Sequence, residues 1–405
     1  MDEKRLINRH IPVLDGLRGL AILAVIVCHV NHAYGGPFLP GRINGPLAAV
    51  FGWGWVGVDL FFVLSGFLIT GILYDAKGCD GYFRNFYARR TLRIMPLYFG
   101  FLFFIMVLSR LGCSFCPWIS RDDAVSLGLY IYNFRVGFTQ HFLYGLHHFW
   151  SLGVEEHFYL LWPLAIWALR RRALIRLCLA VAVASLLLRV IVVLSGVWPL
   201  TAFFITPCRV DGLLAGSLVA LAWRDEADWT LLKLWAGRLV LGTGCLLLGI
   251  ALGQRHFLPD ADPNREHMAS VDGSLVVTVG IAALAVFFSG LIVLAVDAAE
   301  GSRLRRLLER TELRAIGKYS YAIYVFHSLI LLATVQFLSP LSRVPAFIAK
   351  PVAVIWVSAA SFVVAWLSYH LFEKHFLRLK RFFEYQGPVH SAYLVPSLGP
   401  LYRDA

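Results

Sequence analysis

Long apolar segments recur along this chain, and they restrict its possible folds more than any other feature. A helix needs roughly 20 apolar residues to cross about 30 Å of hydrocarbon at 1.5 Å per residue. The first such segment contains Asp15 and Arg18 and has no small-residue cleavage site after it, so we do not expect it to be removed as a signal peptide. We predict ten spans, at residues 14–33, 50–75, 95–112, 149–169, 177–196, 205–223, 239–254, 272–296, 319–338 and 349–373.

The composition excludes an ordinary soluble fold. Hydrophobic residues make up 59% of the sequence and charged residues only 15%, whereas soluble domains are about 25% charged. We therefore predict an all-α, polytopic transmembrane helical bundle, with a membrane domain over residues 1–382 and a cytoplasmic tail over residues 383–405. Residues 122–133 are too few to span comfortably, and we interpret them as re-entrant or interfacial.

The basic residues predict which side of the membrane each segment faces. Cytoplasmic segments of membrane proteins carry the excess of Lys and Arg. Most of the 37 Lys and Arg residues lie in segments that are cytoplasmic if ten spans leave both termini inside. Topology and contact with anionic lipid then account for the net charge of +12, so we expect membrane lipid and no nucleic acid among the partners.

The seven cysteines show no metal-ligand arrangement, and we expect no bound metal. Cys113 and Cys116 form a CxxC pair in a loop predicted to lie outside the cytoplasm. A disulfide and two free thiols are equally compatible with that position.

Ionisable residues inside spans are candidate functional residues, because each costs about 2.5 to 3.5 kcal/mol on insertion scales. Arg18 and His29 are 11 residues apart in the first span, which places them on one helical face and roughly 16 Å apart along the axis. The predicted topology puts other ionisable or polar residues at three depths: Asp59, Glu155, Glu156, Arg209 and Asp211 in the outer halves of their spans, Tyr324 and His327 near the middle, and Arg84, Arg89, Arg90, Arg93 and Lys318 at the inner surface.

This distribution suits a reaction between two substrates from opposite sides. A cationic cytoplasmic mouth suits a polyanionic donor, because guanidinium groups bind phosphates in a bidentate manner. A deeper histidine suits a hydroxyl acceptor, because His is the usual general base near neutral pH. Structural roles compete with each assignment: Arg18 can reach lipid headgroups, the arginines after residue 88 can anchor topology, and Asp59 can pair with an arginine on another helix.

Several stretches together resemble acyltransferase family 3, the integral-membrane acyltransferases that include bacterial O-antigen, exopolysaccharide, peptidoglycan and macrolide O-acyltransferases. Each stretch alone is weakly specific, but their order along residues 11–330 is highly specific. The matching elements are Leu14-Asp15-Gly16-Leu17 with Arg18 and His29, the block from Gly57 to Gly66, Arg90-x-x-Arg93 leading to Pro96 and Tyr98, the block from Trp150 to Pro163, the block from Arg209 to Leu214, and the block from Tyr321 to His327.

The resemblance implies an acyl-CoA-dependent O-acyltransferase of the bacterial inner membrane, with acetyl-CoA the expected donor. The implied acceptor is a hydroxyl of a cell-surface polysaccharide, glycolipid or other glycoside. By resemblance His29 and Arg18 carry catalysis, and Arg90 and Arg93 help to bind the donor. We add Arg89 to that donor set, and assign Glu155 and Asp59 to catalysis and Ser151, Glu156, Arg209, Asp211, Tyr324 and His327 to substrate binding.

Two features depart from the family pattern. His157 stands where the family usually has glutamine. No esterase-like domain follows the last predicted span, so we expect this sequence to lack the arrangement in which a soluble partner domain receives the acyl group.

The expected mechanism is direct transfer, with His29 as the base and Asp59 or Glu155 orienting its ring. A covalent acyl-thioester on Cys28 is the second alternative, although neighbouring positions on a helix point about 100° apart. A transporter or flippase of a glycan precursor is the rival from another class, but we see no internal repeat of the kind such proteins show. A non-catalytic membrane receptor is a third option.

Overall fold

The computed structural model describes residues 10–34, 52–257, 273–337 and 344–385, and the described chain contains helices and turns but no β-strand. The predicted all-α class is therefore confirmed. Residues 386–405 of the predicted cytoplasmic tail lie outside the described ranges.

The helices have the following bounds in chain order. The first half contains α1 (Pro12–Tyr34), η2 (Trp53–Trp55), α3 (Val56–Asp75), α4 (Tyr82–Arg110), α5 (Arg121–Gly128), α6 (Tyr132–Thr139), η3 (His147–Phe149), α7 (Trp150–Ala168), α8 (Arg171–Leu194), α9 (Pro199–Phe204), η4 (Thr206–Cys208) and α10 (Val210–Ala222). The second half contains α11 (Glu226–Phe257), η6 (Val276–Gly280), α13 (Ile281–Val296), α14 (Arg303–Leu308), α15 (Thr311–Lys318), α16 (Ser320–Phe337), α17 (Ala346–Ser368), η8 (Tyr369–Glu373), α18 (Lys374–Arg378) and η9 (Leu379–Phe383).

Eight helical segments of the described chain are long and apolar enough to cross a membrane, by length and composition alone. They correspond to eight of the ten predicted spans. The other two predicted spans, 149–169 and 205–223, form helices that are not both long enough and apolar enough to cross a membrane. Glu155, Glu156 and His157 lower the mean hydropathy of α7, and Pro207, which has no amide hydrogen, lies in η4 just before a 13-residue α10.

Two other boundaries are informative. The α4 helix begins at Tyr82, well before the predicted start at residue 95, so Arg89, Arg90 and Arg93 lie on a helix instead of in a loop. Segment 122–133 forms parts of α5 and α6, each eight residues long. At 1.5 Å per residue each is about 12 Å long, which is too short to cross the bilayer.

Cys113 and Cys116 are joined by a disulfide in the loop after α4.

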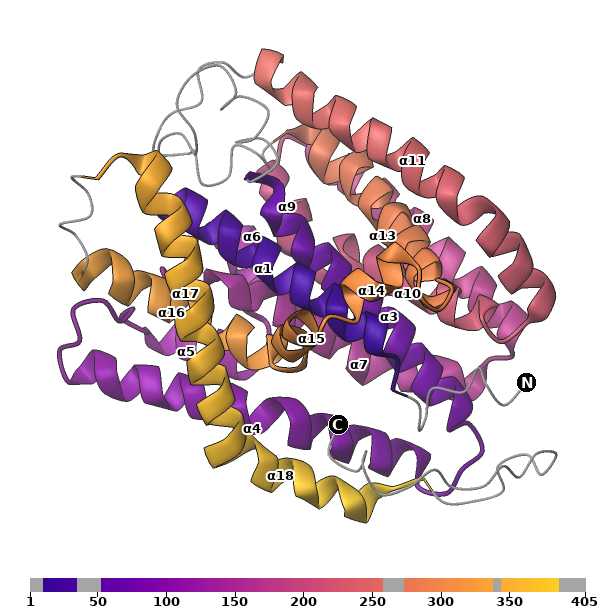
Figure 1. Ribbon diagram of the computed structural model, residues 1–405, viewed down its shortest axis with the longest axis horizontal. Coiled ribbons are helices and arrows are strands. Elements are labelled where there is room, and N and C mark those ends of the chain that lie inside the picture. The colour runs from indigo at the N-terminus through magenta and orange to yellow at the C-terminus, as the bar shows by residue number, and fades with distance from the viewer. Residues whose placement is uncertain (1–9, 35–51, 258–272, 338–343, 386–405) are drawn as a thin grey trace.

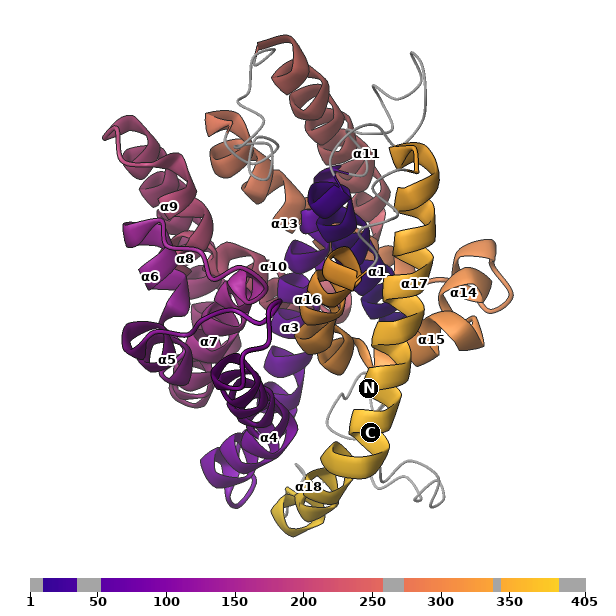
Figure 2. The ribbon, with the colours of Figure 1, turned by 90° about the vertical axis from the view of Figure 1, so that its left-hand side faces the viewer.

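Helix α1 runs through the middle of the bundle, where it contacts α3, α15, α16 and α17 (Figure 1). Helices α11 and α13 pack on each other along one edge, while α4 and α18 contact each other at the opposite edge (Figure 2). Helix α3 packs against α1, α7 and α10. This arrangement surrounds α1 and α3 with helices from both halves of the chain.

Glycine permits the close approach of α3 and α10. A Cβ atom added to Gly66 would overlap the carbonyl oxygen of Leu213, and one added to Gly216 would overlap that of Val63. Small residues at helix contacts allow backbones to approach in this way, and van der Waals packing then holds membrane helices together. The α3–α10 contact therefore has no room for a larger residue at either glycine.

We expect Gly66→Ala to destabilise the bundle by about 1 to 3 kcal/mol, because the added methyl group forces two backbones apart. Thermal unfolding of the purified protein in detergent measures this. Gly242→Ala is the matched control, since no heavy atom of another segment lies within 4 Å of a Cβ placed there. Equal melting temperatures for the two variants would contradict the close packing of α3 and α10.

Candidate functional site

A cavity of about 140 Å³ lies between α1, α3, α4, α7 and α16. On α3 its lining extends from Val58 to Ile69, a rise of roughly 16 Å along that helix. Its polar lining consists of Arg18, Ser65, Arg90, Arg93, Ser151, Glu155, Glu156, Tyr159, Ser320, Tyr321 and Tyr324. Seven of the residues predicted from sequence thus meet in one cavity: Arg18, Arg90, Arg93, Ser151, Glu155, Glu156 and Tyr324.

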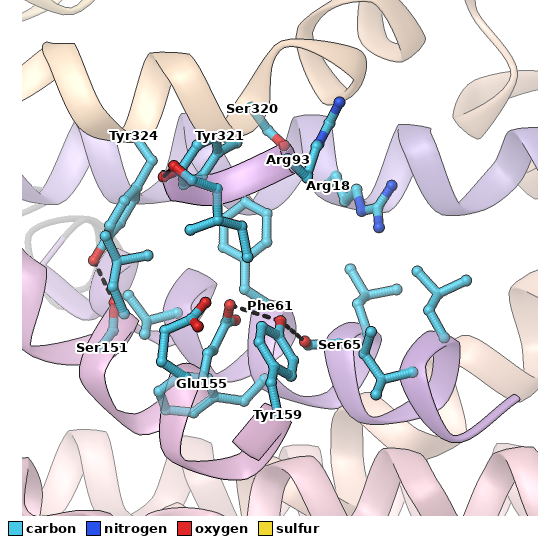
Figure 3. Close-up of a pocket in the computed structure, with 18 of the residues that line it drawn as sticks. Arg18, Phe61, Ser65, Arg93, Ser151, Glu155, Tyr159, Ser320, Tyr321 and Tyr324 are labelled. Atoms are coloured by element: carbon cyan, nitrogen blue, oxygen red, sulfur yellow. Dashed lines mark hydrogen bonds between the residues drawn. The ribbon is translucent and has the colours of Figure 1, made fainter. Parts of the chain in front are cut away.

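Three guanidinium groups line this cavity. Arg90 and Arg93 lie one turn apart on α4, and Arg18 reaches in from α1 (Figure 3). Arg18 lies 3.5 Å from a carboxylate oxygen of Asp15, whereas Arg90 and Arg93 form no hydrogen bond or ion pair with any residue that the structure describes. Because a cation without a bonded partner inside a membrane protein is costly, these two arginines are candidates for holding an anionic ligand, in a cavity that Glu155 and Glu156 also line.

The carboxylates of the cavity come from α7. Glu155 accepts a hydrogen bond of 2.9 Å from the Tyr159 hydroxyl, which also contacts the Ser65 hydroxyl (Figure 3). Glu156 lines the same cavity one residue further along. Arginine and glutamate side chains thus line one cavity. The guanidinium carbon of Arg90 lies 5.3 Å from the centroid of the Tyr159 ring.

Tyr324 and Ser151 bound the cavity at the side away from Arg18 (Figure 3). Their hydroxyl oxygens lie 2.7 Å apart, and the Tyr324 hydroxyl donates a hydrogen bond of 2.6 Å to the carbonyl oxygen of His148. The His148 ring packs 5.0 Å from the Tyr324 ring. Tyr324 therefore contacts both the cavity and the histidines that lie next to it.

Four histidines from three elements gather beyond Tyr324. The ring centroid of His29 lies 5.0 Å from that of His327, 5.1 Å from that of His147 and 6.2 Å from that of His148. Both ring nitrogens of buried His148 lack a hydrogen-bond partner in the described part of the chain. No group of three or more His, Cys, Asp or Glu side chains among the described residues is arranged to hold a metal ion.

His147 and His148 were not predicted as site residues. The signal available in the sequence was their position directly before the block that begins at Trp150, at the start of a predicted span. An aromatic-rich segment at the end of a span is typical of a membrane interface, so sequence position alone gave no reason to place these histidines beside His29.

Asp59, Arg209 and Asp211 lie in buried ion pairs outside the cavity lining. Arg209 donates a 2.7 Å hydrogen bond to Asp59, and Arg189 donates one of 2.6 Å to Asp211. The Arg209 guanidinium is also enclosed by aromatic rings, with that of Phe203 at 4.7 Å. Asp59 thus pairs with the arginine that precedes α10, which is the structural alternative that the sequence had left open.

Three further predicted residues have contacts that differ from the expected ones. Neither Asp59 nor Glu155 contacts His29, whose Nδ1 lies 2.8 Å from Nε2 of His327. The Arg89 guanidinium lies 3.4 Å from the Lys380 carbonyl oxygen, outside the cavity lining. Cys28 is buried, with its sulfur 3.6 Å from both the Gly52 carbonyl oxygen and the His32 ring.

A family model described as an acyltransferase domain, that of acyltransferase family 3, matches residues 11–370. The Bacillus subtilis protein YrhL, a provisional peptidoglycan O-acetyltransferase by name, is 30% identical over 395 residues, covering 91% of this chain and 55% of YrhL. The peptidoglycan O-acetyltransferase OatA of Listeria monocytogenes is 28% identical over 392 residues, covering 90% of this chain and 56% of OatA.

The O-acetyltransferase OatA of Staphylococcus aureus is 28% identical over 343 residues, which cover 80% of this chain and 51% of that protein. This chain thus spans about half the length of the curated relatives it matches. No solved structure shows significant similarity to it.

We expect Asp59→Asn to destabilise the fold by about 3 to 5 kcal/mol, because it leaves the buried Arg209 guanidinium without its counter-ion. Thermal unfolding in detergent measures the loss. Asp122→Asn is the control, since that carboxylate is 77% exposed and 3.8 Å from its arginine. The double variant Asp59→Asn/Arg209→Gln should recover part of the stability. An Asp59→Asn variant with wild-type stability and no activity would instead assign Asp59 to catalysis.

Proposed function

Because this chain belongs to acyltransferase family 3, we propose that it is a membrane O-acetyltransferase. The donor in this proposal is acetyl-CoA from the cytoplasm, and the acceptor is a hydroxyl of a cell-envelope glycan. The membrane is the cytoplasmic membrane of a bacterium, as the bacterial relatives suggest. Relatives named for peptidoglycan support the glycan as acceptor class.

One observation carries the proposal. Arg90 and Arg93, which have no ion-pair partner in the described chain, line a cavity that is bounded by Tyr324, and Tyr324 contacts the histidine group that includes His29. A CoA-type donor combines negatively charged phosphates with a long neutral arm that ends in a thioester. The arginines of the cavity match the phosphates. The histidine beyond the Tyr324 side matches the thioester end, where a base is needed.

The donor phosphates would contact the guanidinium groups of Arg90 and Arg93 at the cytoplasmic part of α4. Arg18 lines the same cavity and would add a third positive charge. The pantetheine arm would then extend along α3 toward Ser151 and Tyr324. Since roughly 16 Å of α3 lines the cavity, an extended arm can bring the thioester from the guanidinium groups to the Tyr324 side.

The chemical step transfers the acetyl group without a covalent enzyme intermediate. The acceptor hydroxyl oxygen attacks the thioester carbonyl carbon while a ring nitrogen of His29 takes the hydroxyl proton. Collapse of the tetrahedral intermediate breaks the carbon–sulfur bond, and the His29 imidazolium returns the proton to the CoA sulfur. The products are the acetyl ester of the glycan and CoA thiol.

The remaining site residues take supporting roles in this proposal. Glu155, Glu156 and Ser151 line the donor cavity and would contact the substrates. His148, with two unpaired ring nitrogens beside His29, offers hydrogen bonds to an acceptor. Asp59, Arg209 and Asp211 would hold α3, α8 and α10 together through their buried ion pairs.

We expect His29→Ala to abolish acetyl transfer without loss of the folded protein, because the change removes the base and leaves an apolar helix. Transfer of radiolabelled acetyl from acetyl-CoA to a glycan acceptor in proteoliposomes measures the activity. His375→Ala is the control, because that histidine is exposed on α18. Cys28→Ala should retain activity, whereas an inactive, folded Cys28→Ala variant would favour the acyl-thioester route.

We expect Arg93→Lys to weaken acetyl-CoA binding, because a point charge cannot reproduce the guanidinium fork. Loss of a charge-assisted phosphate bond should cost about 1.5 to 3 kcal/mol in Arg93→Gln, which is roughly a 10- to 150-fold rise in the apparent KM for acetyl-CoA. The KM for the acceptor should change much less. Arg90 variants should behave in the same way.

Arg84→Lys and Arg84→Gln are the matched controls, because Arg84 is exposed on the same helix and does not line the cavity. The control variants should keep the wild-type KM for acetyl-CoA. If the Arg90 and Arg93 variants also keep it, these arginines only anchor the topology of α4.

A further inference from the structure

His29 and His327 form a direct contact between two imidazole rings. Nδ1 of His29 lies 2.8 Å from Nε2 of His327, and the rings are inclined by only 17°. One of these two nitrogens must carry a hydrogen and the other a lone pair for the contact to be a hydrogen bond. Which nitrogen is the donor decides where the free lone pair of His29 lies.

The backbone of α16 decides this question. Nδ1 of His327 lies 2.7 Å from the carbonyl oxygen of Tyr324 and 3.2 Å from that of Ile323. Carbonyl oxygens only accept hydrogen bonds, so Nδ1 of His327 must carry the hydrogen. In neutral His327 the other nitrogen, Nε2, therefore holds a lone pair and accepts the hydrogen of His29 Nδ1.

We propose that His327 is a positioning residue that holds His29 in the Nδ1–H tautomer and leaves Nε2 of His29 as the atom that takes the acceptor proton. This inference rests on the proposed function, in which His29 is the base. It gives His327 a role different from the substrate contact predicted from sequence. Catalytic histidines commonly need such a partner, and a carboxylate is the usual one.

A neutral partner suits this position. His327 is fully buried and sits in a transmembrane helix, where a carboxylate without a counter-ion would be costly. Asp59 already has Arg209 as its counter-ion, and Glu155 accepts its hydrogen bond from Tyr159. The backbone carbonyls of α16 fix the His327 ring without placing a charge in the apolar interior.

The position of His327 also couples the base to the donor cavity. Tyr324, whose carbonyl oxygen accepts from His327, lines that cavity with its side chain (Figure 3). One turn of α16 therefore sets the ring of His327 and forms the cavity boundary at Tyr324. The orientation of the base and the shape of the donor cavity depend on the same segment.

Three substitutions of His327 separate orientation from simple packing. Glutamine can place its Oε1 near the position of Nε2 and accept the hydrogen of His29. Asparagine is shorter, so it can donate to the Tyr324 carbonyl but cannot reach His29. Leucine has the branched shape of asparagine with a larger volume, and it neither donates nor accepts.

We expect His327→Leu and His327→Asn to lower kcat by about 10²- to 10⁴-fold, the range associated with loss of an oriented general base. The KM values for acetyl-CoA and for the acceptor should stay within about twofold of wild type, because His327 contacts neither substrate in this proposal. His327→Gln should keep kcat within about tenfold of wild type. Size-exclusion profiles and thermal unfolding in detergent identify any variant that fails to fold.

The double variants His29→Ala/His327→Leu and His29→Ala/His327→Gln complete the test. Once the base is absent, its orientation has no effect, so each double variant should show the same transfer as His29→Ala alone, whether that is none or a trace above background. Wild-type kcat in His327→Leu or His327→Asn overturns the inference, as does a rise in acceptor KM at unchanged kcat, which would make His327 a substrate-binding residue. A fully active His29→Ala variant would instead overturn the proposed role of His29, which is a separate result.

Discussion

The cost of placing charge in an apolar interior organises this protein. An ionised side chain there needs a counter-ion, a hydrogen-bonding partner or a ligand. Asp59 with Arg209 and Asp211 with Arg189 meet this need within the protein, with distances of 2.7 and 2.6 Å. Arg90 and Arg93 have no such partner in the described ranges but line a cavity. The contrast between paired and unpaired arginines distinguishes the ion pairs of the scaffold from the candidate site.

Helix α3 connects these two parts of the molecule. Asp59 joins it to Arg209, and Gly66 permits its close packing against α10. Ser65, next to Gly66, lines the cavity and contacts the Tyr159 hydroxyl. Displacement of α3 would therefore move one wall of the cavity, so residues outside its lining can still affect its shape.

The sequence predicted much of the fold, because hydropathy over about 20 residues is a strong signal for membrane helices. It failed where charged residues or a proline change that signal. The carboxylates Glu155 and Glu156 lower the hydropathy of α7, and Pro207 interrupts the chain before α10. The early start of α4 was missed because its arginines resemble a loop anchor, although Arg, Leu and Ala are good helix formers.

Among the candidate residues that line one cavity are Arg18, Arg90, Arg93, Glu155 and Tyr324. The predicted topology had instead placed Glu155 in the outer half of its span and the two α4 arginines at the inner surface. The ion-pair or hydrogen-bond partner of each side chain could not be predicted from the topology. The pairing of Asp59 depends on how α3 meets α10, and His29 contacts His327 across 298 positions of sequence. Such contacts arise from the packing of whole helices, so a single sequence without the fold leaves several partners open.

The separation between the guanidinium groups and His29 has an electrostatic reason under the proposed mechanism. When His29 takes a proton, its imidazolium repels nearby cations. At an effective dielectric constant of about 20, two like charges 4 Å apart repel by about 4 kcal/mol, whereas at roughly 16 Å, the rise from Arg18 to His29, the repulsion falls to about 1 kcal/mol. About 3 kcal/mol corresponds to more than a hundredfold in rate. Under the proposed mechanism, anion binding beside Arg18 and proton transfer at His29 would take place at separate levels of α1, and the length of the donor arm would connect them.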